Sequence, residues 1–511
     1  MTSQYRKQLY VFLAIVALIK LVIAGSVELG NDEVYYYTYA LQPDWNHFDH
    51  PPMVGLLIQL TTFNLHWLSD VAIRLGAITG CVLSSIFVFN TVAMMHNERT
   101  AWYAALLFNC SVYTGVIAGL FILPDSPQIP FWTASLYIMC RMIIRNEVNK
   151  TGSWVLLGLL IGLAALSKVH GLYLWAGFGF FILLKRIKWL LNWRLYVAVM
   201  ITLLCLIPIV YWNIQNDFIT YKFHSERVTH HQVMWDSLLR EILGEFAYQN
   251  PIVFVLVVAS LIALLRKQKT FSSALAVWSL CMSLPMIALF WGVALFNDTL
   301  PHWSGPAYIP LFFVTAQYLD VRAQKKYPTV VKWAGGLVLF VLIAGSLLSN
   351  YAPRNFGSQD KENYGEYCPT LDLNGWDAFG KKFAQIERED IAAGRMKADA
   401  PIVVNKWFPG AHIEKYVATK THQRVLGVGL LDDLHKFAWL NKERKPLQLH
   451  DDAYCITASN LPFDPVKEYA AYFETIEKPV VINQYRSGKV VRYFYVYRMK
   501  DCKLLPPPLL K

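Results

Sequence analysis

Charged side chains are scarce in this 511-residue chain, and the common nucleotide and zinc motifs are missing from it. Asp, Glu, Lys and Arg make up 16% of the residues, whereas apolar residues make up 55%. The length alone would be enough for three or four soluble domains, but this low charge content excludes such an arrangement for most of the chain. Because there is no P-loop, dinucleotide-binding fingerprint or zinc-ligand spacing, we expect neither a nucleotide cofactor nor a structural zinc domain.

Long apolar runs dominate the first two thirds of the chain. A helix needs about 20 apolar residues to cross a bilayer, and a lipid-embedded run must be helical because its backbone amides cannot stay unpaired. The sequence therefore predicts an α-helical polytopic membrane protein with about eleven transmembrane helices. The expected spans lie near residues 8–27, 71–95, 101–120, 126–144, 152–167, 170–184, 195–212, 251–265, 272–295, 304–319 and 331–349.

Lys and Arg cluster in every second connection between these spans. They precede span one and follow spans two, four, six, eight and ten, as at Arg6, Arg99, Arg141, Lys185, Arg266 and Arg322. The positive-inside rule makes this side cytoplasmic, together with the N-terminus. The apolar stretch Met53 to Leu68 would break the alternation if it crossed, so we interpret it as an interfacial helix. The net charge of +11 then reflects topology rather than nucleic-acid binding.

The odd number of spans places everything after Asn350 outside the cytoplasm. Residues 351–511 have an ordinary globular composition, with strand patterns at 401–404, 424–429 and 489–499 and helical patterns near 375–388 and 466–474. We therefore predict two domains, a transmembrane domain over 1–350 and a small mixed α/β domain over 351–511.

Three of the eight cysteines, Cys368, Cys455 and Cys502, lie in that outer domain, where disulfides are chemically permitted. Three cysteines allow at most one bridge within the domain. The sequence does not fix the pair, and Cys455 with Cys502 is slightly favoured.

The first connection between spans is acidic and rich in tyrosine. No Lys or Arg occurs from Leu21 to Ile73, and this stretch holds Glu28, Asp32, Glu33, Asp44 and Asp49. On a helix, Asp32 shares one face with Tyr35 and Tyr36, while Glu33 points about 100° away. Two explanations stay open. The loop could be a solvated acidic segment with an interfacial aromatic belt, or a site where a carboxylate stands beside rings that hold a sugar.

Asp49 and His50 add a further acid and an imidazole, in a turn stiffened by Pro51-Pro52. A divalent cation, Mg²⁺ or Mn²⁺, could be bound at Asp49 and His50, although the sequence assigns no definite cofactor.

Two other outer segments carry polar residues next to apolar spans. In LPDSPQIPFW, Asp125 starts span four, and it could act there simply as a helix N-cap, as Ser126 also could. In ALSKVHGLYLW, Lys168 and His170 lie between two apolar helices. A buried lysine is unfavourable in a membrane unless it is paired or hydrated. Lys168 could snorkel to the interface, or it could bind the phosphate of a ligand.

Two more outer loops carry candidate cations. The loop from Trp212 to Asn250 contains Arg227, whose guanidinium can bind two phosphate oxygens at once. The segment LFNDTLPHWSGPAY places His302 and Trp303 at the start of span ten. Acids, bases and aromatic rings therefore all gather on the outer side, and this shared side is the main indication of a functional site.

The combination and order of these motifs resemble those of the GT-C glycosyltransferases. The resemblance rests on the Asp32-Glu33 pair with its tyrosines, the FDHPP turn, LPDSPQIPFW, LSKVHG and PHW, and it covers residues 1 to 350. The nearest branch is the bacterial one related to protein O-mannosyltransferases and to aminoarabinose transferases that modify lipid A.

This resemblance implies which residues act. Asp32 corresponds to the first-loop catalytic aspartate and Asp125 to a second-loop acid, and Glu33 is a further catalytic candidate. His50 occupies the place where relatives often carry a lysine. The expected phosphate-binding residues are Lys168, His170, Arg227, His50 and His302. The expected sugar- or acceptor-binding residues are Tyr35, Tyr36 and Trp303.

The resemblance also implies an activity. Such an enzyme moves a sugar, with inversion, from a polyprenyl-phosphate donor to a lipid, glycan or protein acceptor on the periplasmic face of a bacterial inner membrane. A carboxylate would deprotonate the acceptor, and cations would stabilise the leaving phosphate. A transporter or flippase of a lipid-linked anionic glycan is the alternative, although transporters place their charges nearer the middle of the membrane. Among enzymes, an oligosaccharide ligase or a phosphoethanolamine-type transferase is a lesser alternative.

Overall fold

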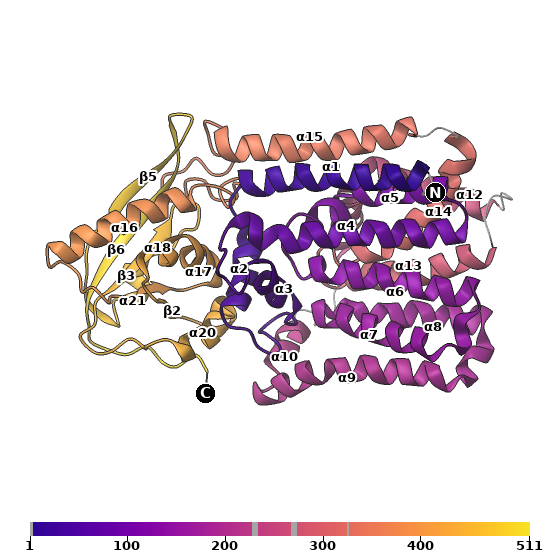
Figure 1. The fold of residues 1–511 in the computed structure, drawn as a ribbon. Coiled ribbons are helices and arrows are strands. Elements are labelled where there is room, and N and C mark those ends of the chain that lie inside the picture. Colours follow the sequence, from indigo (N-terminus) through magenta and orange to yellow (C-terminus); the bar gives the residue numbers. More distant parts are fainter. Residues whose placement is uncertain (1–3, 227–232, 267–272, 324–326, 511) are drawn as a thin grey trace. The chain divides into compact units, whose positions relative to one another are not determined.

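The computed structural model describes residues 4–226, 233–266, 273–323 and 327–510 (Figure 1). The chain forms two compact units. The first consists of Met1–Val22 and Pro43–Val341, and the second consists of Ile23–Gln42 and Leu342–Lys511. The division expected from the sequence, 1–350 and 351–511, did not foresee that Ile23–Gln42 would join the C-terminal residues.

The first unit is built from helices, and α1 and α15 continue from it into the second. Its helices are α1 (Gln4–Ser26), α3 (Met53–Thr61), α4 (Asp70–Met95), α5 (Glu98–Cys110), η1 (Tyr113–Ile117), α6 (Asp125–Ile144), η2 (Glu147–Asn149), α7 (Thr151–Ser167), η3 (Val169–Leu172), α8 (Tyr173–Lys185), η4 (Ile187–Leu191), α9 (Trp193–Gln215), α10 (Ile219–Glu226), α11 (Trp235–Tyr248), α12 (Pro251–Leu265), α13 (Ser273–Ala294), η5 (Gly305–Ala307), α14 (Tyr308–Ala323) and α15 (Thr329–Tyr351). Every expected span overlaps one of these helices.

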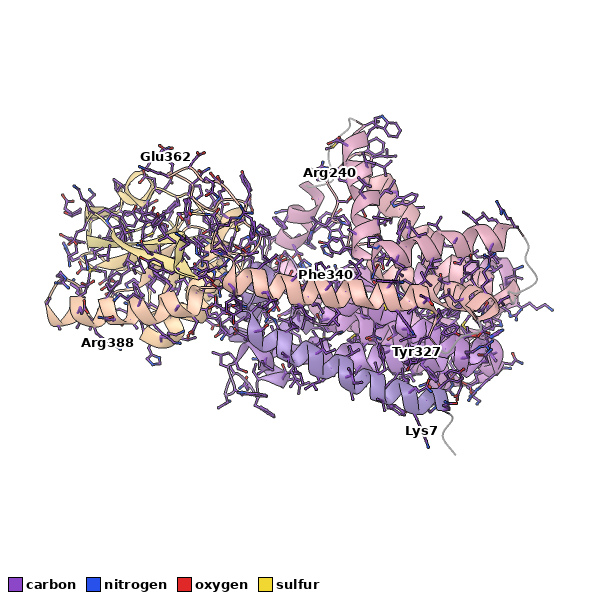
Figure 2. All side chains as sticks on the ribbon, turned by 90° about the horizontal axis from the view of Figure 1, so that it is seen from above. Lys7, Arg240, Tyr327, Phe340, Glu362 and Arg388 are labelled. Atoms are coloured by element: carbon purple, nitrogen blue, oxygen red, sulfur yellow. The ribbon has the colours of Figure 1, made fainter. Side chains whose placement is uncertain are left out.

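Several of these helices are suited to a bilayer, which confirms a multi-pass membrane protein. Within the described residues, five are long and apolar enough to cross a membrane: α1, α4, α9, α13 and α15. The pair α11 and α12, bent by 104° at its break, makes six if it counts as one span. Trp333 on α15 is 71% exposed. Phe340 on the same helix is 67% exposed, as expected of a side chain that faces lipid (Figure 2). The count of eleven spans is not confirmed.

The stretch from Met53 to Leu68 does not form a spanning helix. Only α3, nine residues long, is helical there. The backbone then turns with positive φ at Phe63, Asn64 and Leu65. Because nine helical residues extend only about 14 Å, this segment is too short to cross a bilayer as a helix.

Ion pairs bring together helix ends that the sequence assigned to one side of the membrane. Arg6 near the start of α1 lies 3.8 Å from Glu98 at the start of α5, and the neighbouring Arg99 pairs with Asp320 near the end of α14. These contacts fit the alternation of spans deduced from the basic residues.

The second unit is the predicted mixed α/β fold, a six-stranded sheet with helices. Its elements are α2 (Asn31–Leu41), α16 (Trp376–Ala392), β1 (Ile402–Val404), α17 (Trp407–His412), η6 (Ile413–Ala418), α18 (Thr419–Thr421), β2 (Val425–Gly427), α19 (Leu431–Leu434), α20 (Phe437–Glu443), β3 (Ala453–Ala458), α21 (Pro465–Tyr469), β4 (Phe473–Ile476), β5 (Val480–Arg486) and β6 (Lys489–Cys502). The strand order is β2-β1-β3-β6-β4, and β5 pairs with β6. β1 is parallel to β2 and β3, and β6 is antiparallel to its neighbours.

The expected strands and the helix near 375–388 are confirmed, whereas β3, β4 and β5 were missed. α16 packs on the sheet through Phe379, whose ring stacks on Phe494 of β6 at 4.0 Å. Near its C-terminal end, the buried Asp390 accepts hydrogen bonds from Arg498 at 2.6 and 2.8 Å. Phe494 and Arg498 of β6 therefore bind α16 near its two ends.

All eight cysteines are free, so the favoured disulfide between Cys455 and Cys502 is wrong. Strand register explains this. Cys455 lies opposite Tyr497 on β6, whereas Cys502 lies opposite Phe473 on β4. Both thiols are buried in an apolar cluster and pack as small hydrophobic side chains.

Hydrogen bonds explain why residues 23–42 belong with the C-terminal unit. The Glu28 carboxylate accepts from the backbone N–H groups of Trp376 and Asp377 at 2.8 and 3.0 Å, which caps α16. The backbone N–H of Leu29 donates to the Tyr416 hydroxyl at 2.7 Å. An acid at a helix N-terminus satisfies otherwise unpaired N–H groups. Part of the acidic character of the first loop therefore serves this docking.

Candidate functional site

Asp125 is the centre of a buried polar cluster in the first unit. It is the first residue of α6 and is 1% exposed. The Lys168 ammonium donates to both of its carboxylate oxygens, at 3.0 and 2.9 Å. The Tyr113 hydroxyl donates to Oδ1 at 2.7 Å. The sequence had suggested Asp125 and Lys168 separately, and the fold places them in one ion pair.

These contacts decide between the alternatives that the sequence left open. Asp125 makes no capping hydrogen bond to α6, and the Ser126 hydroxyl instead accepts from the backbone N–H of Leu123 at 3.1 Å. Lys168 is 5% exposed and bound to a carboxylate, so it does not snorkel. Simple capping and simple snorkelling are both excluded.

A close approach of backbone holds Lys168 in place. Lys168 follows the last residue of α7, and Gln128 of α6 donates to its carbonyl oxygen at 3.0 Å. A Cβ on Gly171 would lie 2.4 Å from the nitrogen of Ala165. The tight LSKVHG corner therefore requires glycine at that position.

A second buried acid, Glu245, holds the segment that contains His302 and Trp303. Glu245 of α11 accepts hydrogen bonds from Ser304, from Trp291 at 2.9 Å and from Tyr308 at 3.0 Å. These contacts fix the segment before α14. Gly305 in this segment lies against the Tyr113 ring, where a Cβ would approach within 2.6 Å. The same tyrosine thus contacts Asp125 and the His302 segment.

Aromatic rings surround His170 next to this cluster. The rings of Phe290 and Trp303 lie 5.2 and 6.2 Å from the imidazole, between ring centroids. His170 Nδ1 is buried and has no hydrogen-bond partner among the described residues. The expected sugar-binding Trp303 therefore lies beside an expected phosphate-binding histidine.

The electrostatics link four of the predicted residues. Burial lowers the pKa of His302 to about 4, the charge of Lys168 acts in the same direction, and Asp125 opposes both. His50 lies close enough to lower this pKa as well. His302 is therefore neutral at neutral pH and can donate a hydrogen bond without carrying a charge.

The Asp49-His50 turn packs against α10. The Asp49 carboxylate lies 3.2 Å from His50 Nδ1, and the backbone carbonyl of Asp49 lies 2.8 Å from Nε2 of His224. Within the described part of the chain, no group of three or more His, Cys, Asp or Glu side chains is arranged to hold a metal ion.

In the second unit, Asp32 and Glu33 occupy the first turn of α2 and differ sharply. Glu33 is 2% exposed, and its Oε2 accepts from the backbone N–H of Gly30 at 2.9 Å. This is the reciprocal half of a capping box and is a structural contact. Asp32 is exposed. The neighbouring Asn31 donates to Asp372 Oδ2 at 2.9 Å, and Asp372 is a residue that the sequence gave no reason to select.

The first-loop tyrosines do share one helix face, but this face is buried. Tyr35 is 2% exposed, and its ring lies 5.3 Å from that of Tyr39 and 5.0 Å from that of Trp407. Tyr36 is 7% exposed and packs beside both tyrosines. This aromatic cluster attaches α2 to α17 in the same unit.

The structure brings together Asp125, Lys168, His170, His302, Trp303 and His50 in the first unit, and it places Asp32, Glu33, Tyr35 and Tyr36 in the second. Arg227 lies outside the described residues. The sequence analysis missed Tyr113 because this residue lies within the apolar stretch 101–120, which was interpreted only as a membrane span. A tyrosine within such a span was the only available signal.

Residues 49–212 match the family model described as dolichyl-phosphate-mannose-protein mannosyltransferase. Over 323 residues the chain is 21% identical to the lipid A galacturonosyltransferase RgtD of Rhizobium johnstonii, covering 61% of this chain and 63% of that protein. It is 24% identical over 127 residues to the undecaprenyl phosphate-alpha-4-amino-4-deoxy-L-arabinose arabinosyl transferase 2 of Proteus mirabilis, covering 24% of this chain and 23% of that one.

Among solved structures, the chain resembles ArnT from Cupriavidus metallidurans in the apo state. The TM-score is 0.58 at 15% identity, over 97% of this chain and 98% of that chain. The structure of the same protein bound to undecaprenyl phosphate gives the same TM-score and identity, over 96% and 98%. The resemblance to the GT-C fold deduced from the motifs is thereby confirmed.

Proposed function

We propose that this GT-C-fold chain is an integral membrane glycosyltransferase. It moves a hexose or pentose from a polyprenyl-phosphate donor to a lipid A, glycan or protein acceptor, with inversion. In this proposal it lies in a bacterial inner membrane, with its N-terminus cytoplasmic and its C-terminal unit periplasmic. The observation that carries the proposal is the buried cluster of Asp125, Lys168 and Tyr113 beside His302, built at helix ends of this fold.

The chemistry follows from the residue types. Asp32 takes the proton of an acceptor hydroxyl while the acceptor oxygen attacks the anomeric carbon. The bond from that carbon to the phosphate oxygen breaks, and the polyprenyl phosphate leaves with the electron pair. Lys168, His50 and His302, all in the first unit, are the residues proposed to bind a phosphate group, through hydrogen bonds or charge. A lysine ammonium has three donors, of which Asp125 engages two, so Asp125 orients Lys168 for a phosphate oxygen.

No step of this mechanism requires a metal ion. The placement of the polar groups also favours an enzyme over a flippase. Asp125 opens α6 and Lys168 follows the end of α7, whereas charges that bind a transported ion usually lie near the middle of the membrane.

The proposal is tested by Asp32→Asn in the purified full-length protein. We expect transfer from a polyprenyl-phosphate sugar to fall at least a hundredfold, within the usual range for loss of a general base. Binding of undecaprenyl phosphate should stay unchanged. Asp432→Asn, at another exposed carboxylate of the same unit, is the matched control and should keep full activity. Wild-type turnover in Asp32→Asn would remove the catalytic assignment.

A further inference from the structure

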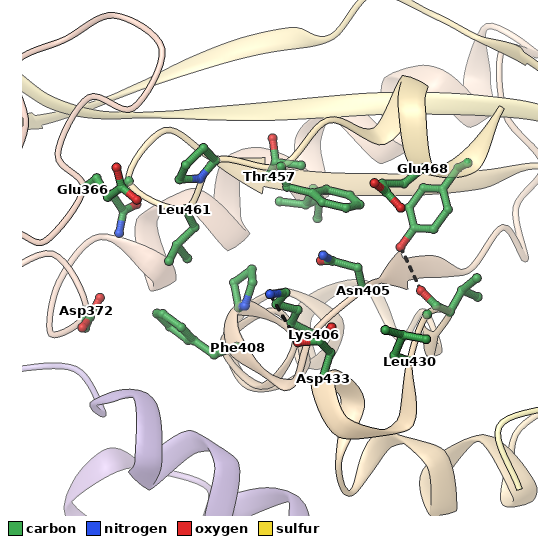
Figure 3. A pocket seen from close by; sticks show the side chains of 18 of the residues that line it. Glu366, Asp372, Asn405, Lys406, Phe408, Leu430, Asp433, Thr457, Leu461 and Glu468 are labelled. Atoms are coloured by element: carbon green, nitrogen blue, oxygen red, sulfur yellow. Dashed lines mark hydrogen bonds and ion pairs between the residues drawn. The ribbon is translucent and has the colours of Figure 1, made fainter. Parts of the chain in front are cut away.

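A cavity of about 1020 Å³ opens at the carboxyl ends of the parallel strands in the second unit (Figure 3). Asn405 follows β1, Val428 follows β2, and Thr457 lies near the end of β3. We call this cavity the strand-end crevice. Ligands of α/β sheets commonly bind at this edge, and the volume is at the upper end of the roughly 300–1,000 Å³ of small-molecule sites.

The strand-end crevice is acidic. It is lined by the carboxylates of Glu366, Asp372, Asp433 and Glu468. Among its lining residues, all in the described part of the chain, Lys406 is the only Lys or Arg, and it lies 3.3 Å from Asp433 (Figure 3). The remaining negative charge repels phosphate and carboxylate groups and favours neutral or amine-bearing ligands.

A buried amide in the crevice lacks a protein partner. Asn460 is 6% exposed, and its Oδ1 has no hydrogen-bond partner among the described residues. A buried acceptor left unsatisfied costs about 1–3 kcal/mol, so such an atom usually indicates a ligand or an ordered water. The Asn405 side chain also projects into the cavity (Figure 3). The side-chain oxygens of these two amides can accept hydrogen bonds, so they favour a ligand with several hydrogen-bond donors.

Aromatic rings complete the lining, at Phe408, Phe463 and Tyr472. A lining that combines ring faces with amides and carboxylates suits a ligand with apolar C–H faces and many hydroxyl groups. Carbohydrates have this character, and acidic groups among the rings add a preference for amino sugars.

One end of the crevice approaches the proposed catalytic acid. Asp372 lines the crevice and accepts the hydrogen bond from Asn31, whose neighbour in the chain is Asp32. Burial raises the pKa of Asp372, Arg492 opposes this, and the charge of Asp32 adds to the increase, as expected for neighbouring carboxylates. A ligand in the crevice would therefore extend toward Asp32 within the same unit.

We infer that the strand-end crevice binds the acceptor as a short glycan whose bound sugars carry hydroxyl or amino groups and no phosphate or carboxylate. This inference rests on the proposed function, since it gives the acceptor class for transfer at Asp32. The acceptor atom is then a sugar hydroxyl or amine, rather than an oxygen of a phosphate group.

Binding of soluble trisaccharides to the full-length protein in detergent tests this. The probes are chitotriose, which is neutral, its deacetylated form, which is cationic, and trigalacturonate, which is anionic. Isothermal titration should show binding of the first two, tighter for the cationic one, and none of trigalacturonate. Asn405→Ala and Tyr472→Ala should each weaken binding of both ligands about tenfold, and Glu468→Gln should weaken only the cationic one. Glu443→Gln, an exposed acid on α20 outside the crevice, is the control and should bind as the wild type does.

The inference would be overturned if trigalacturonate bound as tightly as chitotriose. It would also be overturned if neither chitotriose nor its deacetylated form bound, or if the affinity for these two ligands stayed unchanged in all three crevice variants. Undecaprenyl phosphate binding, measured in the same samples, separates this result from the proposed function. If the lipid binds and the trisaccharides do not, only the acceptor assignment is wrong. If the lipid also fails to bind, the glycosyltransferase proposal is wrong as well.

Discussion

Lys168 reaches Asp125 across 43 positions of sequence and donates to both of its carboxylate oxygens. Both partners are buried, so each charge depends on the other. A buried ion pair is weak evidence for stability by itself, because removing two charges from water is unfavourable. Its position at the start of α6 and just after the end of α7 instead favours a role in presenting an ammonium group to a ligand.

Removing one partner of this pair should be more harmful than removing both. Asp125→Ala leaves the Lys168 charge buried and unpaired, which should destabilise the protein by about 3–5 kcal/mol. The double variant Asp125→Leu with Lys168→Met should recover much of this stability while losing undecaprenyl phosphate binding. Thermal unfolding in detergent and a lipid-binding assay would measure the two effects. Additive losses of stability would show that the pair is not coupled.

The pKa of His302 predicts how stability depends on pH. Burial and Lys168 lower this pKa to about 4, whereas an unfolded histidine titrates near 6.5. Between these values the unfolded chain binds more protons, so the contribution of neutral His302 is complete above about pH 6.5 and is lost as the pH falls toward 4. His302→Gln should flatten this part of the profile. Equal slopes for variant and wild type between pH 7.5 and 4.5 would contradict the shift.

His302 should also act on the donor as a neutral hydrogen-bond donor at neutral pH. His302→Gln keeps such a donor and should retain most undecaprenyl phosphate binding, whereas His302→Ala should lose about tenfold, since a hydrogen bond to a charged group is worth roughly 1.5–3 kcal/mol. Equal losses in both variants would point to a need for the charged imidazole.

Glu33 should prove structural. Its carboxylate caps α2 through the backbone N–H of Gly30, and a glutamine can accept the same hydrogen bond. Glu33→Gln should therefore keep nearly full transfer activity, whereas Glu33→Ala should lose about 0.5–2 kcal/mol of stability, as other caps do. Activity and thermal unfolding would both be measured. Loss of turnover in a stably folded Glu33→Gln protein would restore a catalytic role.

Impermeant thiol labelling of intact cells tests the orientation. Tyr367 in the second unit and Leu191 after α8 are both 89% exposed, and the sequence assigns them to opposite sides of the membrane. Tyr367→Cys should react with the reagent added outside, and Leu191→Cys only after permeabilisation. The parent background is low because only Cys205 is not buried. The reverse pattern would invert the topology.

The sequence by itself determined that the chain is a multi-pass membrane protein with a mixed α/β tail, although the number of spans is not confirmed. Apolar runs and basic clusters are local signals, because transfer into lipid depends on each segment's own side chains. The strands 401–404, 424–429 and 489–499 were visible for the same reason, since their β-branched and aromatic residues occur in short runs. β3, β4 and β5 were missed, and each of them is a strand that pairs with β6, a contact between segments that no local pattern shows.

Only the tertiary structure decided which partner each polar residue has. The Asp125–Lys168 pair, the Tyr113 hydroxyl that completes it and the docking of Glu28 on α16 all join segments far apart in the chain. The burial of Tyr35 against Trp407 is of the same kind. The sequence shows which chemistry each side chain is capable of. The packing of distant segments determines which charged groups are desolvated and which atoms they contact.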